Sequence, residues 1–298
     1  MNHPDSSRRT FLRRAVSIAS ALPLILGRDR TRAATLEKLL PADEALILDR
    51  LEKGKNHSRL PEGDLVAEMG RSFLGRPYGA NTLEEEGEEH LVVDLREFDC
   101  VTLCETSLAL ARAIKLRIRS VEGYSAQLQL IRYRSGIIRG YPSRLHYFSE
   151  WIADNEEKKI LKNITMELGG GKDSRRLDFM SAHREAYPRL SSAKVFDAIT
   201  ATEEKLAAIP RYVLPKERVE GILGMIRSGD IIAITTSVAG LDVSHTAIAV
   251  REGGTARLLH APNVGERVQY TSGSIAEYLH RHAQQSGIIV ARPLDPEG

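Results

Sequence analysis

Apolar residues follow a helical spacing through most of the first half of the chain. Between residues 35 and 60 they recur at helical intervals, with Pro41 between two short predicted helices. A further helix is predicted over residues 63–73 and is closed by Gly75. The strongest helical pattern runs from Asp99 to Ile114, where no Gly or Pro interrupts the apolar positions. This half of the chain is therefore predicted to be mainly helical.

Short apolar runs separated by turn residues dominate the last third of the chain. Arg251-Glu252-Gly253-Gly254 predicts a hairpin turn between two of these runs, and residues 274–282 predict a short helix. The predicted strands are 231–235, 244–250, 256–261, 267–270 and 287–291. Helices that come first and an antiparallel sheet that follows indicate an α+β fold.

Three segments between these halves have little periodicity. Residues 84–90 (EEEGEEH) predict a solvated acidic surface loop rather than a metal site. Residues 91–95 predict a short strand or extended piece, and residues 169–174 predict a flexible turn. The glycines of this turn lack the spacing of a phosphate-binding loop.

The N-terminus has the order of regions that defines an export signal. Arg8 and Arg9 are followed by Phe11 and Leu12, and then by an apolar run over residues 15–26 that is too short to span a bilayer. The paired arginines predict a twin-arginine signal peptide over residues 1–34 and the twin-arginine export machinery as a partner. We expect a periplasmic or extracellular protein with no stable membrane anchor. The alternative is a basic leader that stays attached.

The net charge of +2 is misleading, because it includes this signal. Residues 1–33 hold seven Arg and two Asp, a net charge of +5, so the remainder carries −3. No basic stripe is left to neutralise phosphates, and we expect no nucleic acid as a partner.

The two cysteines, Cys100 and Cys104, lie four residues apart on the predicted helix 99–114. Side chains at this spacing are neighbours but do not aim at each other, so a disulfide between them would be strained. We therefore expect two free thiols.

Cys100 is a candidate nucleophile because it stands at the start of that helix. A helix N-terminus favours a thiolate over a thiol, and its free N–H groups can stabilise an oxyanion. His245 begins a predicted strand and is a candidate base. His260, on the partner strand of the hairpin, could orient His245 from the same face. From spacing alone, a buried core cysteine and structural histidines remain the alternative.

The motifs around these residues resemble the NlpC/P60 superfamily of papain-like cell-wall hydrolases. More narrowly, the chain resembles its DUF1460 branch, described as N-acetylmuramoyl-L-alanine amidase-like, from about residue 60 onward. The superfamily motifs are Gly75-Arg76-Pro77-Tyr78, residues 98–103, residues 229–232, residues 244–250 and Leu258-Leu259-His260. The narrower match adds Thr82-Leu83-Glu84, residues 91–100 and residues 144–152.

This resemblance implies a papain-like core in which the nucleophile helix packs on an antiparallel sheet. It implies that Cys100 is the nucleophile, His245 the base and His260 the orienting residue. It also implies that Tyr78 lies beside the nucleophile, where its hydroxyl could help an oxyanion hole. The long gap between Cys100 and His245 implies one catalytic domain over residues 35–298 with an insertion at about 115–215 that shapes the cleft.

Two positions depart from the pattern of the resemblance. Residue 104 is Cys where an aliphatic residue is expected, and we interpret it as a core residue. Pro262 follows His260-Ala261 where the branch more often has Ser, which affects local geometry rather than the role of His260.

Three further residues are weighed as substrate or oxyanion ligands. Arg144 could bind a substrate carboxylate with two hydrogen bonds, and His146 could face the same cleft. The alternative is that the segment around them packs in the core. Asp99 could hydrogen-bond backbone groups at the site, although capping of the helix is the simpler interpretation.

The function predicted from these residues is metal-independent hydrolysis of an amide bond in peptidoglycan fragments or muropeptides by a cysteine nucleophile, with no cofactor. The bond is either lactyl–L-alanine or one within the stem peptide, between D-glutamate and the diamino acid. One alternative is a non-catalytic peptidoglycan-binding module. Another is a zinc site formed by Cys100, His245 and His260.

Overall fold

The computed structural model describes residues 39–264 and 266–296, so the predicted signal peptide lies outside the described residues. The α-helices are α2 Pro41–Gly54, α3 Glu62–Arg71, α4 Cys100–Lys115, α5 Val121–Arg132, α6 Phe148–Glu157, α7 Phe179–Ala182, α8 Ala193–Leu206, α9 Lys216–Val219 and α10 Ile275–His280. The 3-10 helices are η2 Lys55–His57, η3 Arg134–Gly136, η4 Tyr141–Ser143, η5 Arg184–Ala186, η6 Pro188–Ser191 and η7 Glu220–Met225. The strands are β1 Leu161–Asn163, β2 Gly171–Asp173, β3 Arg211–Pro215, β4 Ile231–Thr236, β5 Val243–Glu252, β6 Thr255–His260, β7 Gln269–Tyr270 and β8 Gln285–Pro293.

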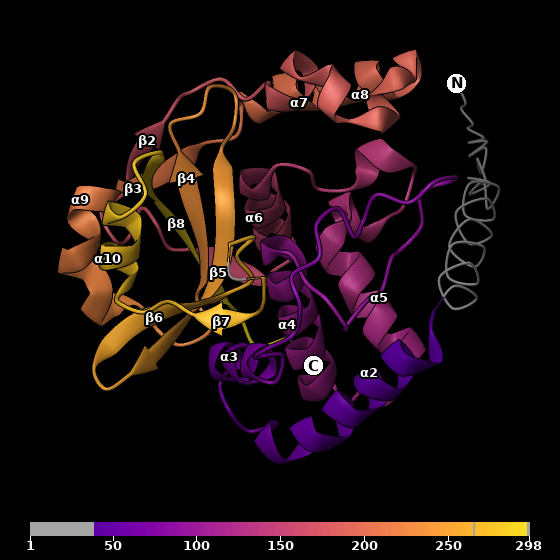
Figure 1. Cartoon of the computed structure of the whole chain (residues 1–298), viewed down its shortest axis with the longest axis vertical. Coiled ribbons are helices and arrows are strands. Elements are labelled where there is room, and N and C mark those ends of the chain that lie inside the picture. The colour runs from indigo at the N-terminus through magenta and orange to yellow at the C-terminus, as the bar shows by residue number, and fades with distance from the viewer. Residues whose placement is uncertain (1–38, 265, 297–298) are drawn as a thin grey trace, which may run out of the picture.

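The strands form one antiparallel sheet in the order β2-β3-β8-β4-β5-β6-β7, with β1 also paired to β8 (Figure 1). β5 and β6 are joined by Gly253 and Gly254, whose φ angles of 56° and 86° give the left-handed backbone of a tight hairpin turn. The predicted combination of helices with an antiparallel sheet is therefore confirmed, but the succession is not strict, because β1 and β2 precede α7 and α8 and β3 precedes α9.

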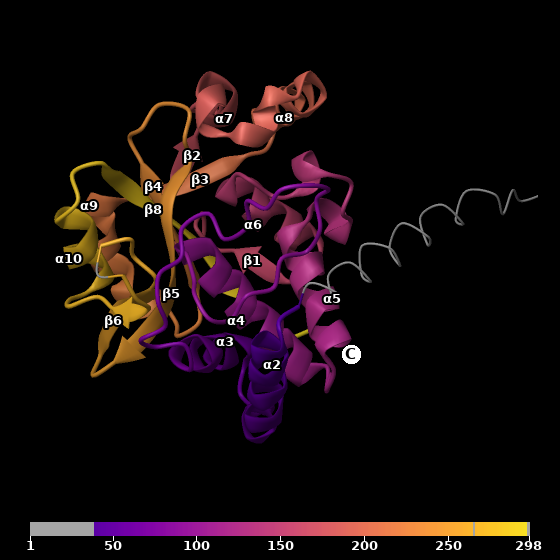
Figure 2. The same cartoon turned by 45° about the vertical axis from the view of Figure 1, so that its right-hand side comes forward.

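Helices cover both faces of this sheet. In β5, Ile248 and Val250 join the larger core with α2 to α6, whereas Ala247 and Ala249 join a second core with α9 and α10. Figure 2 shows α9 and α10 on one side of the strands and α3, α4 and α6 on the other. Alternate residues of β5 thus face different helical layers, which decides where its histidine points.

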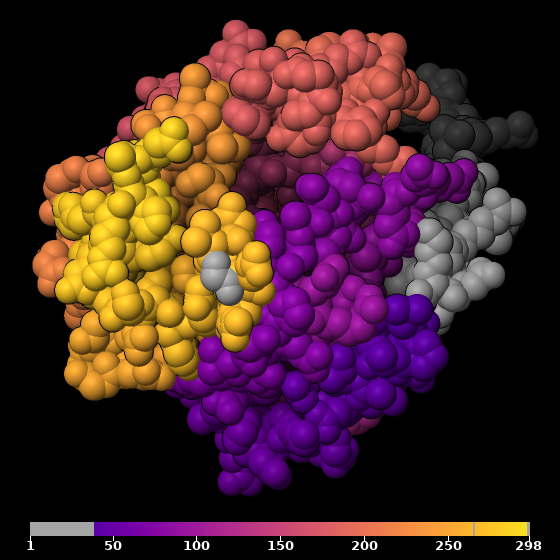
Figure 3. Space-filling view, in the orientation of Figure 1, coloured from indigo at the N-terminus to yellow at the C-terminus, as the bar shows by residue number. Residues whose placement is uncertain are grey.

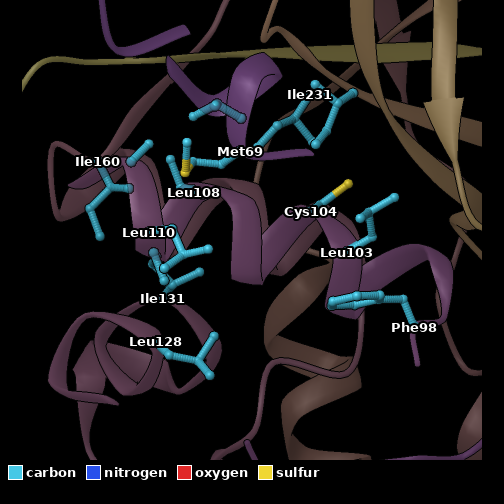
Figure 4. Packing of buried hydrophobic residues seen from close by; sticks show 14 of the residues in the cluster. Met69, Phe98, Leu103, Cys104, Leu108, Leu110, Leu128, Ile131, Ile160 and Ile231 are labelled. Carbon is cyan, nitrogen blue, oxygen red and sulfur yellow. The ribbon is translucent and has the colours of Figure 1, made fainter. Parts of the chain in front are cut away.

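α4 lies at the centre of the larger core. All of its residues from Thr102 to Ile114 are buried, and Figure 4 shows Leu103, Leu108 and Leu110 packed among side chains of neighbouring elements. Cys104 is fully buried in the same cluster, which confirms its interpretation as a core residue. Both cysteines are free.

The structure corrects several predicted elements. Pro41 begins α2, where its missing N–H costs no hydrogen bond, and the helix predicted before it lies largely outside the described residues. Residues 171–173 are not part of a flexible turn but form β2, which pairs with β3. Only Gln269 and Tyr270 of the predicted strand 267–270 join the sheet as a strand. No helix of the described residues is long and apolar enough to cross a membrane.

Candidate active site

The nucleophile candidate is held by the start of α4. The Asp99 carboxylate accepts hydrogen bonds from the backbone N–H of Thr102 (2.7 Å) and from its hydroxyl (2.9 Å). The Thr102 hydroxyl in turn accepts one from the backbone N–H of Asp99, which completes a capping box. Asp99 is therefore a helix cap, and Cys100 is the first residue of the helix. The thiol-bearing residue is half-buried.

The sheet meets this helix end at Thr246. Its hydroxyl donates to the backbone carbonyl of Cys100 at 2.6 Å and lies 3.7 Å from the Cys104 sulfur. Thr246 follows His245 directly on β5, so the same strand brings the candidate base to the nucleophile's helix end. Within the described residues, no hydrogen bond joins the Cys100 sulfur to the His245 ring.

The two predicted histidines are brought together. His245 Nε2 lies 2.8 Å from His260 Nδ1, in hydrogen-bond contact. The pairing of Ile248 with Leu259 places His260 opposite Ala247, two residues from His245 and on the same face of the sheet. The predicted cross-strand pairing is therefore confirmed in its geometry. It leaves His245 Nδ1 as the nitrogen available to a reacting group.

Burial sets the protonation of this centre. It lowers the pKa of His245 to about 3 and that of His260 to about 4, and the nearby histidines add to both shifts. Burial and the Asp99 carboxylate raise the pKa of Cys100 to about 11. Burial thus opposes the thiolate that the helix N-terminus is expected to favour. The resting pair is a neutral thiol and a neutral imidazole.

Backbone hydrogen bonds hold Tyr78 close to the candidate nucleophile. Its N–H donates to the carbonyl of Glu266, and the N–H of Gly79 donates to the carbonyl of Phe98. Burial, with smaller contributions from Cys100 and Asp99, raises the pKa of the Tyr78 phenol. The phenol is thus close enough to Cys100 to be influenced by it, and its part in an oxyanion hole stays a prediction.

Tyr278 is a site residue that sequence analysis missed. Its ring meets the His260 ring edge-on, with centroids 5.4 Å apart and an interplanar angle of 88°. The Tyr278 ring also contacts the His282 ring, with centroids 4.4 Å apart. Nothing in the sequence marks this tyrosine, because only the packing of α10 against the hairpin brings it to the histidines.

A cleft of about 530 Å³ opens beside the histidine pair. Its lining includes His245, His260, Tyr278, Arg281, His282 and Gln285. Figure 3 shows the surface hollowed between the orange and yellow C-terminal segments and the purple segments of the first half. The salmon segment of α7 and α8 borders the same hollow, whereas the lining of the cleft beside the histidine pair comes from residues 244–285 alone.

Arg144 and His146 lie elsewhere. The Arg144 side chain is 6% exposed, donates to the Leu83 carbonyl and pairs with Glu84 at 2.6 Å and Glu89 at 3.5 Å. His146 Nε2 contacts the Tyr141 carbonyl, and its ring packs on the Tyr141 ring. Neither residue lines the cleft of the histidine pair. The structure thus leaves Arg144 no free face for a substrate carboxylate.

The acidic loop is less solvated than predicted. Glu84, Glu85, Glu86 and Glu88 are exposed, but the Glu89 side chain is only 5% exposed and also receives the Tyr133 hydroxyl at 2.9 Å. Among the described residues, no group of three or more His, Cys, Asp or Glu side chains has the arrangement of a metal site.

Comparison with known proteins places the chain in a family. Residues 68–288 match the family described as N-acetylmuramoyl-L-alanine amidase-like. A crystal structure of an N-acetylmuramoyl-L-alanine amidase from Bacteroides uniformis is 34% identical, with a TM-score of 0.75, over 78% of this chain and 99% of that one. A search of curated proteins gave no match.

Two further structures share the fold. A Bacteroides fragilis protein provisionally named a xylanase is 36% identical, with a TM-score of 0.72, over 76% of this chain and 99% of that one. A Legionella pneumophila protein assigned to DUF1460 is 18% identical, with a TM-score of 0.64, over 88% of this chain and 97% of that one. At that identity the second likeness concerns the fold alone.

Proposed function

Because the chain belongs to the N-acetylmuramoyl-L-alanine amidase-like family, we propose that it is a cysteine-dependent amidase. Its substrate in this proposal is a peptidoglycan fragment, cut between the lactyl group and L-alanine. The observation that carries the proposal is the His245–His260 pair, 2.8 Å apart, on the strand that contacts the helix end bearing Cys100.

The arrangement supports a centre of the papain-like NlpC/P60 type. A helix that begins at a cysteine packs on an antiparallel sheet, and that sheet supplies two histidines in hydrogen-bond contact. A nucleophile, a base and a group that orients the base are the parts that covalent amide hydrolysis requires. Here Cys100, His245 and His260 take these three roles.

The first step is the transfer of the thiol proton. If His245 Nε2–H donates to His260 Nδ1, then His245 Nδ1 carries a lone pair and can accept the proton of Cys100. Since burial keeps both partners neutral at rest, proton transfer accompanies attack of the sulfur on the amide carbonyl. The new C–S bond leaves a negative charge on the carbonyl oxygen.

The charge on that oxygen is stabilised by hydrogen-bond donors near the nucleophile. The unpaired first-turn N–H groups of α4 and the Tyr78 hydroxyl are the candidates. Collapse of the intermediate breaks the C–N bond, and the imidazolium of His245 returns its proton to the leaving amine. Water, deprotonated by His245, then hydrolyses the thioester and releases the acid and the free thiol.

The xylanase name of one relative points to a different chemistry. Glycoside hydrolysis generally uses two carboxylic side chains that flank the scissile bond. The described residues that line the cleft at His245 include no Asp or Glu. The cleft therefore favours acyl transfer over glycoside hydrolysis.

We further propose that the protein acts outside the cytoplasm, where peptidoglycan lies. The basis is the sequence alone, with its paired arginines and short apolar run over residues 8–26.

The test is mass spectrometry of defined muropeptides after incubation with the protein in the presence of a chelator. Three proteins are compared: wild type, Cys100→Ala, and Cys104→Ala as the matched control one helical turn away. We expect wild type and Cys104→Ala to release free stem peptide and Cys100→Ala to release none. Shortened stems would move the cut inside the peptide, and no product from folded wild type would overturn the amidase proposal.

A further inference from the structure

The cleft beside the histidine pair has an uneven distribution of charge. Its described lining residues include Arg281 and three histidines but no carboxylate. Both histidines of the pair are neutral because burial lowers their pKa values. The permanent charge of this lining is therefore positive and comes from Arg281.

Arg281 is held in place without being neutralised. It caps the C-terminal end of α10, and its Nη1 donates to the Ser272 hydroxyl at 2.7 Å. The acid one turn back, Glu277, is already used, because its carboxylate accepts the N–H of Ser274 in a capping box. Within the described residues Arg281 forms no ion pair. Its guanidinium keeps free donors on an exposed side chain.

The position of Arg281 relative to the reaction centre follows from α10. Tyr278, which touches the His260 ring, lies three residues before Arg281, and side chains at this spacing are neighbours on a helix. Their Cβ atoms are about 5–6 Å apart. The guanidinium therefore lies along the same wall of the cleft, one helical turn away from the histidine pair.

Arg144 offers the contrasting case. It too carries a guanidinium that can donate two hydrogen bonds, but it does not line the cleft, and Glu84 and Glu89 occupy its guanidinium. A carboxylate-binding role fits an arginine whose fork is oriented but unpaired, since Arg binds carboxylates through two parallel hydrogen bonds. Of the two residues, only Arg281 meets this condition.

We propose that Arg281, oriented by Ser272, forms a subsite for a carboxylate of the substrate's peptide part. The inference rests on the proposed amidase function. In this proposal the peptide part of the substrate lies along α10, and the muramoyl part lies outside the Arg281 subsite. The carboxylate concerned is the free α-carboxyl of the second stem residue, which lies about 7 Å along an extended peptide from the scissile nitrogen.

The experiment compares two muramoyl-L-alanyl-D-glutamate substrates with the γ-carboxyl blocked in both. They differ only at the α-carboxyl, which is free in one and a carboxamide in the other. We expect the full chain to favour the free carboxylate about 10- to 100-fold in kcat/KM, the range of one charged hydrogen-bonded contact. Arg281→Met should bring this ratio to about one, with the loss in KM rather than kcat. Arg281→Lys should retain part of it.

Arg119→Met is the matched control, because Arg119 is also exposed, forms no ion pair among the described residues and does not line the cleft. It should keep the wild-type ratio. A helix-capping role alone would make Arg281→Met lower the melting temperature while the substrate ratio stays unchanged, and that result overturns the subsite.

A binding experiment tests this subsite independently of the amidase function. The Cys100→Ala full chain is titrated with L-alanyl-D-glutamate peptides that carry either the free α-carboxyl or its amide. Tighter binding of the acid, lost when Arg281→Met is added, supports the subsite even if no muramoyl substrate is cut. Equal binding of the two peptides, or no binding of either, overturns it while leaving any measured amidase activity intact.

Discussion

Two groups of basic side chains in this protein use their charge in opposite ways. On the β5–β6 hairpin, burial keeps the imidazoles of His245 and His260 neutral, and Arg281 at the end of α10 has no carboxylate partner among the described residues. In the second group, Arg144 pairs with Glu84 and Glu89 of the acidic loop. Arg189 makes a longer contact with Glu89, at 3.8 Å. We call these the histidine wall and the acidic-loop wall.

The difference distinguishes charged groups that stabilise the fold from groups that are available to a substrate. A charge that is already paired and buried holds elements together, and removing one partner leaves the other without compensation. An oriented group without a partner is available to a ligand. The acidic-loop wall therefore anchors the segment that leads to the proposed nucleophile, whereas the histidine wall is the part to which the proposed function assigns reaction with the substrate and its binding. This division predicts where substitutions affect activity and where they affect stability.

The largest expected effect is on activity, in the histidine wall. His245→Ala should lower kcat on the order of 10⁴-fold, because the base is lost. His260→Ala should lower it by about 10²-fold, because the base remains but is no longer oriented. Steady-state kinetics measures both, and thermal melting should show folded proteins. The comparison breaks if His245→Ala unfolds the chain or if both variants remain fully active.

The second prediction concerns the resting state of the nucleophile. Burial raises the pKa of Cys100 to about 11, so the thiol is neutral below that pH and its thiolate fraction grows about tenfold per pH unit. Burial also lowers the pKa of His245 to about 3, so above that pH the imidazole stays neutral and cannot form a stable ion pair with the sulfur. Alkylation of Cys100 by iodoacetamide should therefore speed up by about 10³-fold between pH 7 and 10.

Mass spectrometry locates the label, and the buried Cys104 should stay unlabelled in the folded protein. A reaction rate that reaches a plateau below pH 7 would mean a thiolate–imidazolium pair at rest. That result would contradict the neutral pair while leaving the assignment of the nucleophile in place.

The two walls also differ in how far the sequence predicts them. α4, the β5–β6 hairpin and the His245–His260 contact follow from local signals: a capped apolar helix, a Gly-Gly turn and the alternation of strand side chains. The partners of Arg144 lie about 60 residues away in a segment with no periodicity, so the sequence indicates only a solvated acidic run. Charge composition does not tell which carboxylates become buried.

Tyr278 and Arg281 were missed for a related reason. Their helix was predicted, but a short amphipathic helix does not say which strand face it covers. Only the packing of α10 against the sheet places Tyr278 at the histidines and Arg281 on the cleft. The three-residue strands β1 and β2 could not be predicted from the sequence either, because they are too short to show the alternation of apolar and polar residues that marks a strand.

The third prediction tests the acidic-loop wall through stability. Arg144→Met should lower the free energy of unfolding by about 3 kcal/mol, because it leaves the buried Glu89 carboxylate with only the longer contact to Arg189. Activity per folded molecule should fall little. Arg281→Met, the same change on the histidine wall, should alter stability by less than about 0.5 kcal/mol. Urea unfolding measures both.

Adding Glu89→Gln to Arg144→Met should recover part of the lost stability, because the uncompensated charge is removed. If instead Arg144→Met is stable but raises KM for the free carboxylate substrate, the carboxylate site belongs to Arg144, and the division between the walls is wrong.

The smallest expected effect separates two roles of Tyr278. Its ring fixes the His260 ring edge-on, whereas its hydroxyl is not part of the proposed proton transfer. Tyr278→Leu should therefore lower kcat by about tenfold, within the range of losses seen when groups that orient a reacting side chain are removed. Tyr278→Phe keeps the ring and should stay within about twofold of wild type. An equal loss in both variants would give the hydroxyl a direct part in the reaction, and the histidine wall would then supply a donor as well as a base.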